Sequence, residues 1–315
     1  MSPHPIPLTV IGGYLGAGKT ALVNHLLSAG AAQSTTVLVN DFGALDIDAR
    51  LIADRGADTI SLANGCICCA VGDQLVSTLM RIGRQETPPA NLVIETSGIA
   101  DPRRVAQIGT AGKRFRLTGL IVVVDASDIR HRSHDPRVGE LIMRQLAAAD
   151  LLVVNKCDLV DTPALEDARS WLAEQAPEAG QICTQDGRVP AEVVLSDQAP
   201  TQPPEGALGD ADPEPSHGLM TRLVDVPRRL SSDALRDLVE GLPGEVVRAK
   251  GLVTPDDQAG EIWRIDRVGP RVHMQRVSAE IADEDLNRLV LIGSTEALTE
   301  MPARFGMDRA SKTAS

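Results

Sequence analysis

A glycine-rich loop from Gly13 to Thr20 reads Gly-Tyr-Leu-Gly-Ala-Gly-Lys-Thr and matches the pattern G-x-x-x-x-G-K-[ST]. The short apolar run at residues 6–11 predicts a buried strand before it, and residues 22–27 predict a helix after it. In that context the glycines let backbone N–H groups converge on phosphate oxygens. Lys19 supplies a positive charge, and the Thr20 hydroxyl is a ligand for Mg²⁺. The loop therefore predicts a site for a nucleoside triphosphate with bound Mg²⁺.

Further apolar runs predict strands at residues 36–40, 92–95, 120–125 and 151–155, with helical stretches between them. Nearly continuous apolar strands are typical of a parallel sheet that is covered on both faces. The fold class that we predict is α/β, with a doubly wound, mostly parallel sheet in a P-loop nucleotide-binding domain, followed by a smaller α+β domain. The predicted boundaries are 1–189 for the first domain, 190–218 for a Pro-rich and acidic flexible linker, 219–305 for the second domain and 306–315 for a tail.

The overall composition restricts the partners that this chain can have. Its net charge is -12, which argues against nucleic acid because phosphate neutralisation needs clustered Lys and Arg. No apolar run is long enough for a membrane helix, and the N-terminus lacks the pattern of a signal peptide. Five cysteines, three of them crowded together, make a poor disulfide framework, so we expect reduced thiols and a cytoplasmic protein.

The run Asn155-Lys156-Cys157-Asp158 follows the predicted strand at residues 151–155. A carboxylate at Asp158 can accept hydrogen bonds from guanine N1–H and the exocyclic amine together, and adenine lacks that pair of donors. Asn155 would reach the acceptor edge of the base, and the stem of Lys156 would cover its face. The run therefore predicts GTP as the nucleotide, and it disfavours a phosphate-loop kinase that uses ATP.

Glu95 ends another predicted strand and is followed closely by Gly98. A carboxylate at this strand end can hold Mg²⁺ through water, and the Gly98 N–H can sense a γ-phosphate. We therefore predict Lys19, Thr20 and Glu95 as catalytic residues, with Thr20 and Glu95 at the magnesium ion. Asp125 ends the next strand, and we interpret it as structural. The residues predicted to bind the nucleotide are Gly13, Tyr14, Leu15, Gly16, Ala17, Gly18, Lys19, Thr20, Gly98, Asn155, Lys156 and Asp158.

Three cysteines, Cys66, Cys68 and Cys69, stand within four residues. Thiolates prefer soft or borderline metals such as zinc and copper(I). Three ligands leave one position of a tetrahedral site open, which suits metal transfer better than a structural role. Buried small side chains or a redox pair are the alternative interpretations of this cluster. Cys157 and Cys183 are interpreted as core residues.

These motifs together resemble the CobW-type GTPases, relatives of the urease and hydrogenase nickel-insertion GTPases. The resemblance rests on G-G-Y-L-G-A-G-K-T, on N-G-C-I-C-C, on E-T-S-G-I-A-D-P and on A-D-L-L-V-V-N-K-C-D-L, and it continues in the C-terminal domain. The family's N-E-F-G-E segment is Asn40-Asp41-Phe42-Gly43-Ala44 in this chain. Asp41 keeps a shorter carboxylate there, and we assign it as a further zinc ligand beside the three cysteines.

The resemblance implies a GTP-dependent metallochaperone that loads zinc into a client metalloprotein, with GTP, Mg²⁺ and Zn²⁺ bound. Turnover is expected to be slow without a partner. One alternative is an activator or insertase for a cobalt or iron enzyme. Another is a non-enzymatic, zinc-responsive regulator that uses GTP only as a ligand. The client is left open, and so is the oligomeric state, with a homodimer among the options.

Overall fold

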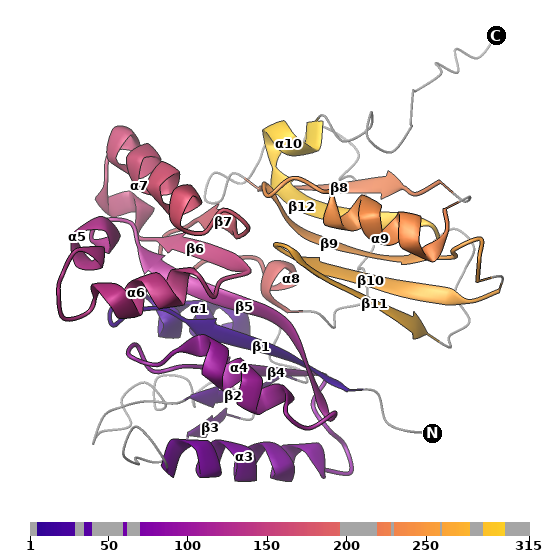
Figure 1. The fold of residues 1–315 in the computed structure, drawn as a ribbon, viewed down its shortest axis with the longest axis horizontal. Coiled ribbons are helices and arrows are strands. Elements are labelled where there is room, and N and C mark those ends of the chain that lie inside the picture. The colour runs from indigo at the N-terminus through magenta and orange to yellow at the C-terminus, as the bar shows by residue number, and fades with distance from the viewer. Residues whose placement is uncertain are drawn as a thin grey trace. The chain divides into compact units, whose positions relative to one another are not determined.

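The computed structural model describes residues 5–28, 35–39, 59–61, 70–195, 219–227, 230–258, 260–277 and 286–299. The chain divides into two compact units, Met1–Ala199 and Pro200–Ser315. The described elements of each unit are labelled in Figure 1. Each unit contains its own sheet and is described separately below.

The first unit is built on a seven-stranded sheet in the order β3-β2-β4-β1-β5-β6-β7, and every strand pair in it is parallel. The strands are β1 (Ile6–Gly12), β2 (Thr35–Val39), β3 (Thr59–Ser61), β4 (Asn91–Glu95), β5 (Phe115–Asp125), β6 (Leu151–Asn155) and β7 (Gly180–Cys183). The predicted doubly wound parallel sheet is confirmed. Because strand order reverses at β1, the carboxyl end of this strand is where a ligand site is expected.

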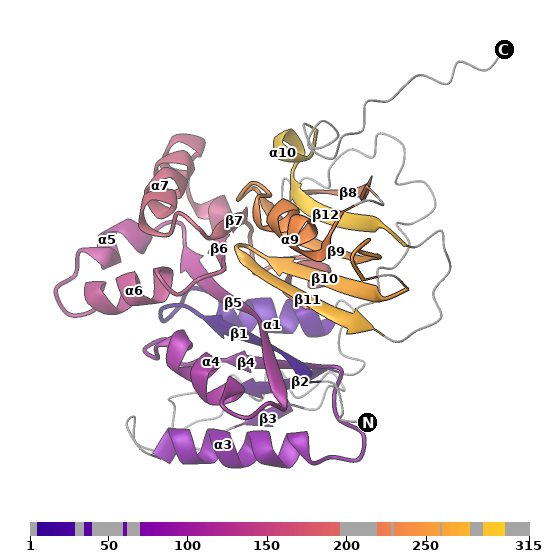
Figure 2. The same ribbon diagram turned by 45° about the vertical axis from the view of Figure 1, so that its right-hand side comes forward.

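Helices cover both faces of this sheet (Figures 1 and 2). They are α1 (Lys19–Leu26), α3 (Ala70–Gly83), α4 (Pro102–Thr110), α5 (Ile129–Ser133), α6 (Gly139–Leu146), α7 (Thr162–Gln175) and α8 (Ala191–Val194), with a 3-10 turn η2 (Cys157–Leu159). One face packs Val10 and Val122 against Leu75 of α3, Val105 of α4 and Ile142 of α6. The core is aliphatic, as the low aromatic content of 2% requires.

Helix α8 lies inside the segment that the sequence predicts as a linker. Its residues Ala191, Val193 and Val194 are buried, and the Thr9 hydroxyl of β1 donates to the Val194 carbonyl at 3.1 Å. Residues 190–195 therefore belong to the folded first unit and not to a linker, because their apolar side chains pack on the sheet. Residues 196–218 lie outside the described part of the chain.

The second unit is an antiparallel sheet of five strands in the order β11-β10-β9-β12-β8. Its elements are β8 (Leu219–Asp225), α9 (Ser232–Glu240), β9 (Val246–Val253), β10 (Ile262–Val268), β11 (Arg271–Val277), β12 (Arg288–Ser294) and α10 (Thr295–Thr299). Leu235 and Val239 of α9 pack on Ala249, Ile265 and Leu291 of the sheet. The predicted smaller α+β domain is confirmed.

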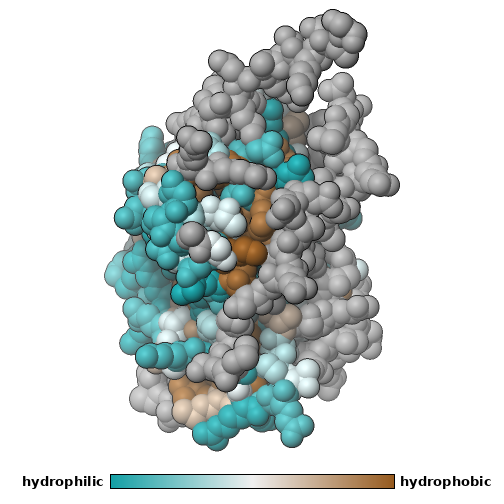
Figure 3. Space-filling view, turned by 90° about the vertical axis from the view of Figure 1, so that its right-hand side faces the viewer, coloured by the Kyte–Doolittle hydropathy of each residue, from teal (hydrophilic) through white to brown (hydrophobic). Residues whose placement is uncertain are grey.

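One face of the molecule is shown in Figure 3. Figure 3 shows hydrophilic side chains over most of the described surface on one side, with hydrophobic residues in a narrow band. Among the described helices, none is both long and apolar enough to cross a membrane.

Candidate functional site: a phosphate loop beside a base-recognition loop

The glycine-rich loop connects β1 to α1 at the carboxyl edge of the sheet. Gly13, Gly16 and Gly18 have φ angles of 132°, 78° and 104°, a region that L-amino acids with a side chain rarely adopt. A Cβ atom at Gly13 would lie 2.2 Å from the Val123 carbonyl oxygen, and one at Gly18 would lie 2.1 Å from the Asn155 amide nitrogen. The loop can therefore approach β5 and Asn155 only because these positions lack side chains.

Lys19 begins α1 directly after this loop, and it is buried with 8% of its surface exposed. Its Nζ donates to the Tyr14 carbonyl at 3.2 Å, which curls the ammonium group back over the loop. The helix has no side-chain cap at Gly18, so its positive dipole end faces the same loop. A buried cation and a helix N-terminus together favour a bound anion such as phosphate.

Thr20 and Glu95 meet at this edge from different elements. The Thr20 hydroxyl of α1 donates to Glu95 Oε1 at 2.7 Å, and Glu95 is a buried residue at the end of β4. The sheet positions it, because Glu95 is paired in register with Ile11 of β1 and Val39 of β2. A hydroxyl and a carboxylate side by side are hard oxygen ligands of the kind that Mg²⁺ prefers, so these two residues fit such an ion.

Gly98 lies against the phosphate loop. An added Cβ atom would stand 2.7 Å from the Leu15 amide nitrogen, so no side chain fits there. The buried Gln145 of α6 holds the turn in place, since its Nε2 donates to the Gly98 carbonyl at 3.2 Å and to the Ala100 carbonyl at 2.9 Å. The predicted phosphate sensor is thus adjacent to the loop that would hold the phosphate.

The side chain of Asn155 forms hydrogen bonds with two other loops, the phosphate loop and the loop that contains Gly187. Its Nδ2 donates to the Ala17 carbonyl at 2.9 Å, and its Oδ1 accepts from the Gly187 N–H at 3.0 Å. The sequence predicts contact with the base instead. The two roles are compatible, because an amide nitrogen carries two donors and one remains for a base acceptor. Gly187 belongs to the loop between β7 and α8, which sequence reasoning did not connect with this site.

Lys156 has a φ of 61° and forms an ion pair with Asp125, with Nζ 2.7 Å from Oδ2. Burial raises the pKa of Asp125, but hydrogen bonds from Lys156 and Ser127 outweigh it and hold the pKa below its usual value. Asp125 is therefore a charged anchor for the lysine stem, in line with its predicted structural role. Asp158 stands two residues further in η2 with its side chain exposed to solvent.

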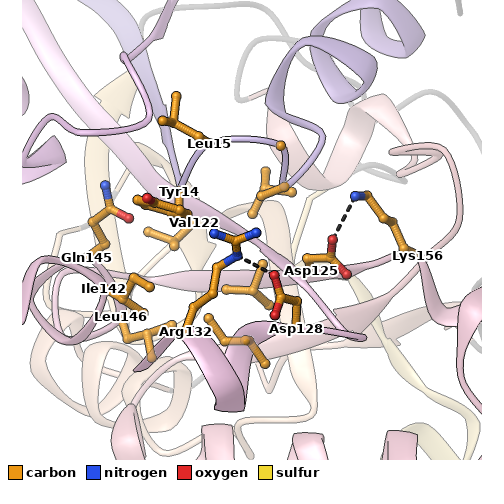
Figure 4. A pocket seen from close by; sticks show the side chains of 15 residues that line it. Tyr14, Leu15, Val122, Asp125, Asp128, Arg132, Ile142, Gln145, Leu146 and Lys156 are labelled. Atoms are coloured by element: carbon orange, nitrogen blue, oxygen red, sulfur yellow. Dashed lines mark hydrogen bonds and ion pairs between the residues drawn. The ribbon is translucent and has the colours of Figure 1, made fainter. Parts of the chain in front are cut away.

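An open cavity lies beside the phosphate loop, between the end of β5 and helices α5 and α6 (Figure 4). Tyr14 and Leu15 form one wall, and Asp128 and Arg132 lie opposite (Figure 4). Arg132 pairs with Asp128 and stands over the Tyr14 ring, 5.3 Å from its centroid. These two charged residues are not predicted from the sequence, because no local pattern shows that their polar segment faces the phosphate loop.

The family model for the CobW/HypB/UreG nucleotide-binding domain matches residues 7–183, and the model for the cobalamin synthesis protein CobW C-terminal domain matches residues 221–306. The chain belongs to the CobW family. The first match contains the phosphate loop, Glu95 and the run from Asn155 to Asp158, so these residues lie in the nucleotide-binding domain of the family.

Curated relatives of this CobW-family chain carry zinc in their names. It is 31% identical to a Zinc chaperone CobW of a Sinorhizobium species over 91% of this chain and 92% of the relative. It is 28% identical to a Zinc chaperone CobW of Pseudomonas aeruginosa over 91% of this chain and 87% of the relative. A Zinc-regulated GTPase metalloprotein activator 1 of Schizosaccharomyces pombe is 35% identical over 53% of this chain and 43% of the relative.

The metal residues predicted for this CobW-family chain lie outside the described part of the structure. Asp41, Cys66, Cys68 and Cys69 all fall in the undescribed ranges. Within the described ranges, no group of three or more His, Cys, Asp and Glu residues could hold a metal ion. The metal motif therefore remains a prediction from the sequence.

Proposed function

We propose that this chain is a GTP-hydrolysing metallochaperone that loads zinc into a client metalloprotein under the control of its nucleotide. The observation that carries the proposal is the convergence of Lys19, Thr20 and Glu95 on one loop at the edge of the sheet. The named zinc chaperones among its relatives support zinc as the cargo. We expect the protein to act in the cytoplasm, where thiols stay reduced.

The proposed reaction is GTP plus water to GDP plus phosphate. Lys19 and the N–H groups of the loop hold the phosphate oxygens and stabilise the charge that spreads over them in the transition state. Thr20 and Glu95 would hold Mg²⁺, which supplies further neutralisation of phosphate charge when bound. Glu95 also positions the Mg²⁺ ion or the attacking water. The Gly98 N–H senses the γ-phosphate by hydrogen bonding to it. We expect slow turnover until a client engages.

Guanine selectivity is assigned to the exposed Asp158, whose carboxylate would accept from two donors of the base. Asn155 would add one donor to the acceptor edge, and the stem of Lys156, held by Asp125, would cover the face of the base. These contacts make GTP the substrate. The cargo is held by Cys66, Cys68 and Cys69, with Asp41 as a further ligand.

The reduced protein is expected to bind about one Zn²⁺ tightly through the thiolates of Cys66, Cys68 and Cys69. Affinity should fall steeply at low pH, because the thiols must lose protons to bind. Competition with a chromophoric chelator measures both quantities. The control is Cys157→Ala/Cys183→Ala, which removes the other cysteines of the chain. A Cys66→Ala/Cys68→Ala/Cys69→Ala variant with unchanged zinc affinity would show that the cargo site lies elsewhere.

Zinc affinity is expected to differ between the GDP-bound protein and the protein bound to a non-hydrolysable GTP analogue. A coupling of about 1–3 kcal/mol is typical of allosteric pairs, and zinc must change the ratio of GTP to GDP affinity by the same factor. The measurement is zinc titration in each nucleotide state at fixed Mg²⁺ and pH. Equal affinities would mean that the nucleotide does not control the cargo, and the proposed switch would be wrong.

The choice of zinc over cobalt or iron is tested in the same titration. Co²⁺ and Fe²⁺ are added under anaerobic conditions to the GTP-analogue form, and competition with Zn²⁺ ranks them. Nucleotide-dependent binding of cobalt or iron, without such dependence for zinc, would favour an insertase for a cobalt or iron enzyme.

A further inference from the structure

One side of the phosphate loop faces the open cavity drawn in Figure 4. Tyr14 and Leu15 form the wall of this cavity, and the Tyr14 side chain is only partly buried against the core. A side chain in a closely packed interior is fixed by its neighbours on every side. The Tyr14 ring has open space on one side, so its conformation depends strongly on the few groups that contact it there.

Arg132 of the short helix α5 makes such a contact. Its guanidinium carbon stands 5.3 Å from the centroid of the Tyr14 ring, within the roughly 6 Å at which a cation attracts the face of an aromatic ring. Asp128, one helical turn earlier, forms an ion pair with the same guanidinium (Figure 4). The ion pair orients the guanidinium group, and the guanidinium group restrains the ring.

Tyr14 connects this contact to the groups that we propose to act on the nucleotide. Its carbonyl oxygen accepts from Lys19 Nζ at 3.2 Å, so the position of the Tyr14 backbone determines where the ammonium group lies. The amide nitrogen and the side chain of the next residue, Leu15, lie against Gly98. A displacement of Tyr14 would therefore move the phosphate-binding cation and disturb the contact with the phosphate sensor.

We propose that Arg132 is a positioning residue for GTP hydrolysis, which restrains the Tyr14 ring and thereby holds Lys19 in place. Arg132 does not touch the nucleotide in this role. The restraint raises the rate because a preorganised cation need not be rearranged when charge develops on the transferring phosphoryl group. This inference rests on the proposed hydrolysis of GTP, and it adds to that reaction a residue from outside the phosphate loop.

The alternative is that Arg132 and Asp128 only stabilise helix α5, as an i,i+4 ion pair does on an exposed helix surface. Arg144 and Glu140 form an equivalent exposed i,i+4 pair on α6. The two pairs differ because Arg132 also stands over a residue of the phosphate loop. Arg144→Ala is therefore the matched control, since it removes an arginine and its helical ion pair without removing a contact to Tyr14.

The first measurement tests the contact itself and needs neither nucleotide nor GTPase activity. The chain contains a single tyrosine, so 3-fluorotyrosine labelling of the full chain gives one fluorine NMR signal, from Tyr14. We expect Arg132→Ala to shift and narrow this signal, because the ring gains freedom beside the open cavity. Arg144→Ala should leave the signal in place. A signal that is the same in Arg132→Ala and in the wild type would overturn the proposal.

The second measurement is single-turnover hydrolysis of GTP, whose rate constant does not depend on the fraction of protein that is folded. Arg132→Ala is expected to lower this rate constant about fivefold, which corresponds to about 1 kcal/mol, the size of a cation–π contact. Arg132→Lys should recover part of the loss, since an ammonium group can also stand over the ring, and Arg132→Gln should not. Arg144→Ala should match the wild type. Circular dichroism confirms that each variant is folded.

A double-mutant cycle decides whether Arg132 acts through Tyr14. Tyr14→Leu removes the ring, so Arg132→Ala should lower the rate no further in that background. Tyr14→Phe keeps the ring, so Arg132→Ala should retain its fivefold effect there. An equal loss in both backgrounds would overturn the proposal, and so would an unchanged rate in Arg132→Ala alone. A wild-type protein that does not hydrolyse GTP would instead contradict the proposed function, and the fluorine signal would still show whether the contact between Arg132 and Tyr14 exists.

Discussion

Replacing Glu95 by glutamine is expected to lower the rate of GTP hydrolysis at least about 100-fold, the usual loss when one preorganised electrostatic group is removed from a transition state. The side chain keeps its size and can still accept a hydrogen bond from Thr20, so the phosphate loop should keep its conformation. The lost charge is the one that we propose to hold Mg²⁺ and orient water. Single-turnover hydrolysis of radiolabelled GTP at saturating Mg²⁺ measures the effect.

The matched control is Asp150→Asn, which neutralises another buried carboxylate of the same sheet. Asp150 accepts from the Leu120 N–H at 2.8 Å, just before β6 begins, at the end of the sheet away from the phosphate loop. This variant is expected to lose stability but to keep the catalytic groups, so its rate of GTP hydrolysis per folded molecule should match the wild type. Comparable rates for Glu95→Gln and wild type, at equal GTP occupancy, would remove Glu95 from the mechanism.

Asp158→Asn is expected to abolish the preference for GTP over ATP. We expect the wild type to bind GTP at least about tenfold tighter, which corresponds to 1.4 kcal/mol. The amide of asparagine offers a donor where guanine also offers donors, and a xanthine base, which presents an acceptor there, should bind instead. Calorimetry with GTP, ATP and XTP gives the three affinities directly.

Asp161→Asn controls for the loss of one negative charge close to this site. Asp161 caps α7 by accepting from the Ala164 N–H at 2.9 Å, and asparagine is an equally good N-cap. Nucleotide selectivity should be unchanged in this variant. Equal affinity of the wild-type protein for ATP and GTP would contradict the assignment of Asp158 before any variant is made.

Patterns within one segment were enough to predict most of the fold. Buried parallel strands form continuous apolar runs, so the predicted residues 92–95 and 151–155 agree closely with β4 and β6. The phosphate loop was predictable because its glycines and its lysine stand in a fixed order, and that order specifies one local backbone conformation. Strand β3 and helix α8 were missed, since three- and four-residue elements carry too little periodicity to be detected.

The remaining parts of the site depend on contacts between distant segments, which no local pattern reveals. Gln145 lies 47 residues from Gly98 in sequence and is placed against it only by packing of α6. The sequence offers one signal for this contact, because Gln145 is a polar residue on the apolar helix face that Ile142 and Leu146 define.

The amide of Asn155 limits how the surrounding loops can change during evolution. Because it is bonded to both Ala17 and Gly187, an insertion between β7 and α8 would pull it away from the phosphate loop. Gly187 is fixed from the other side as well, since a Cβ atom there would lie 2.5 Å from the Leu22 nitrogen. The exposed side chain of Arg188 carries no such restriction, whereas the equally exposed Asp186 has a φ of 53°, which favours Asp, Asn or Gly at that position. Lineages that diversify this loop can therefore do so by substitution at its exposed positions, while its length stays constant.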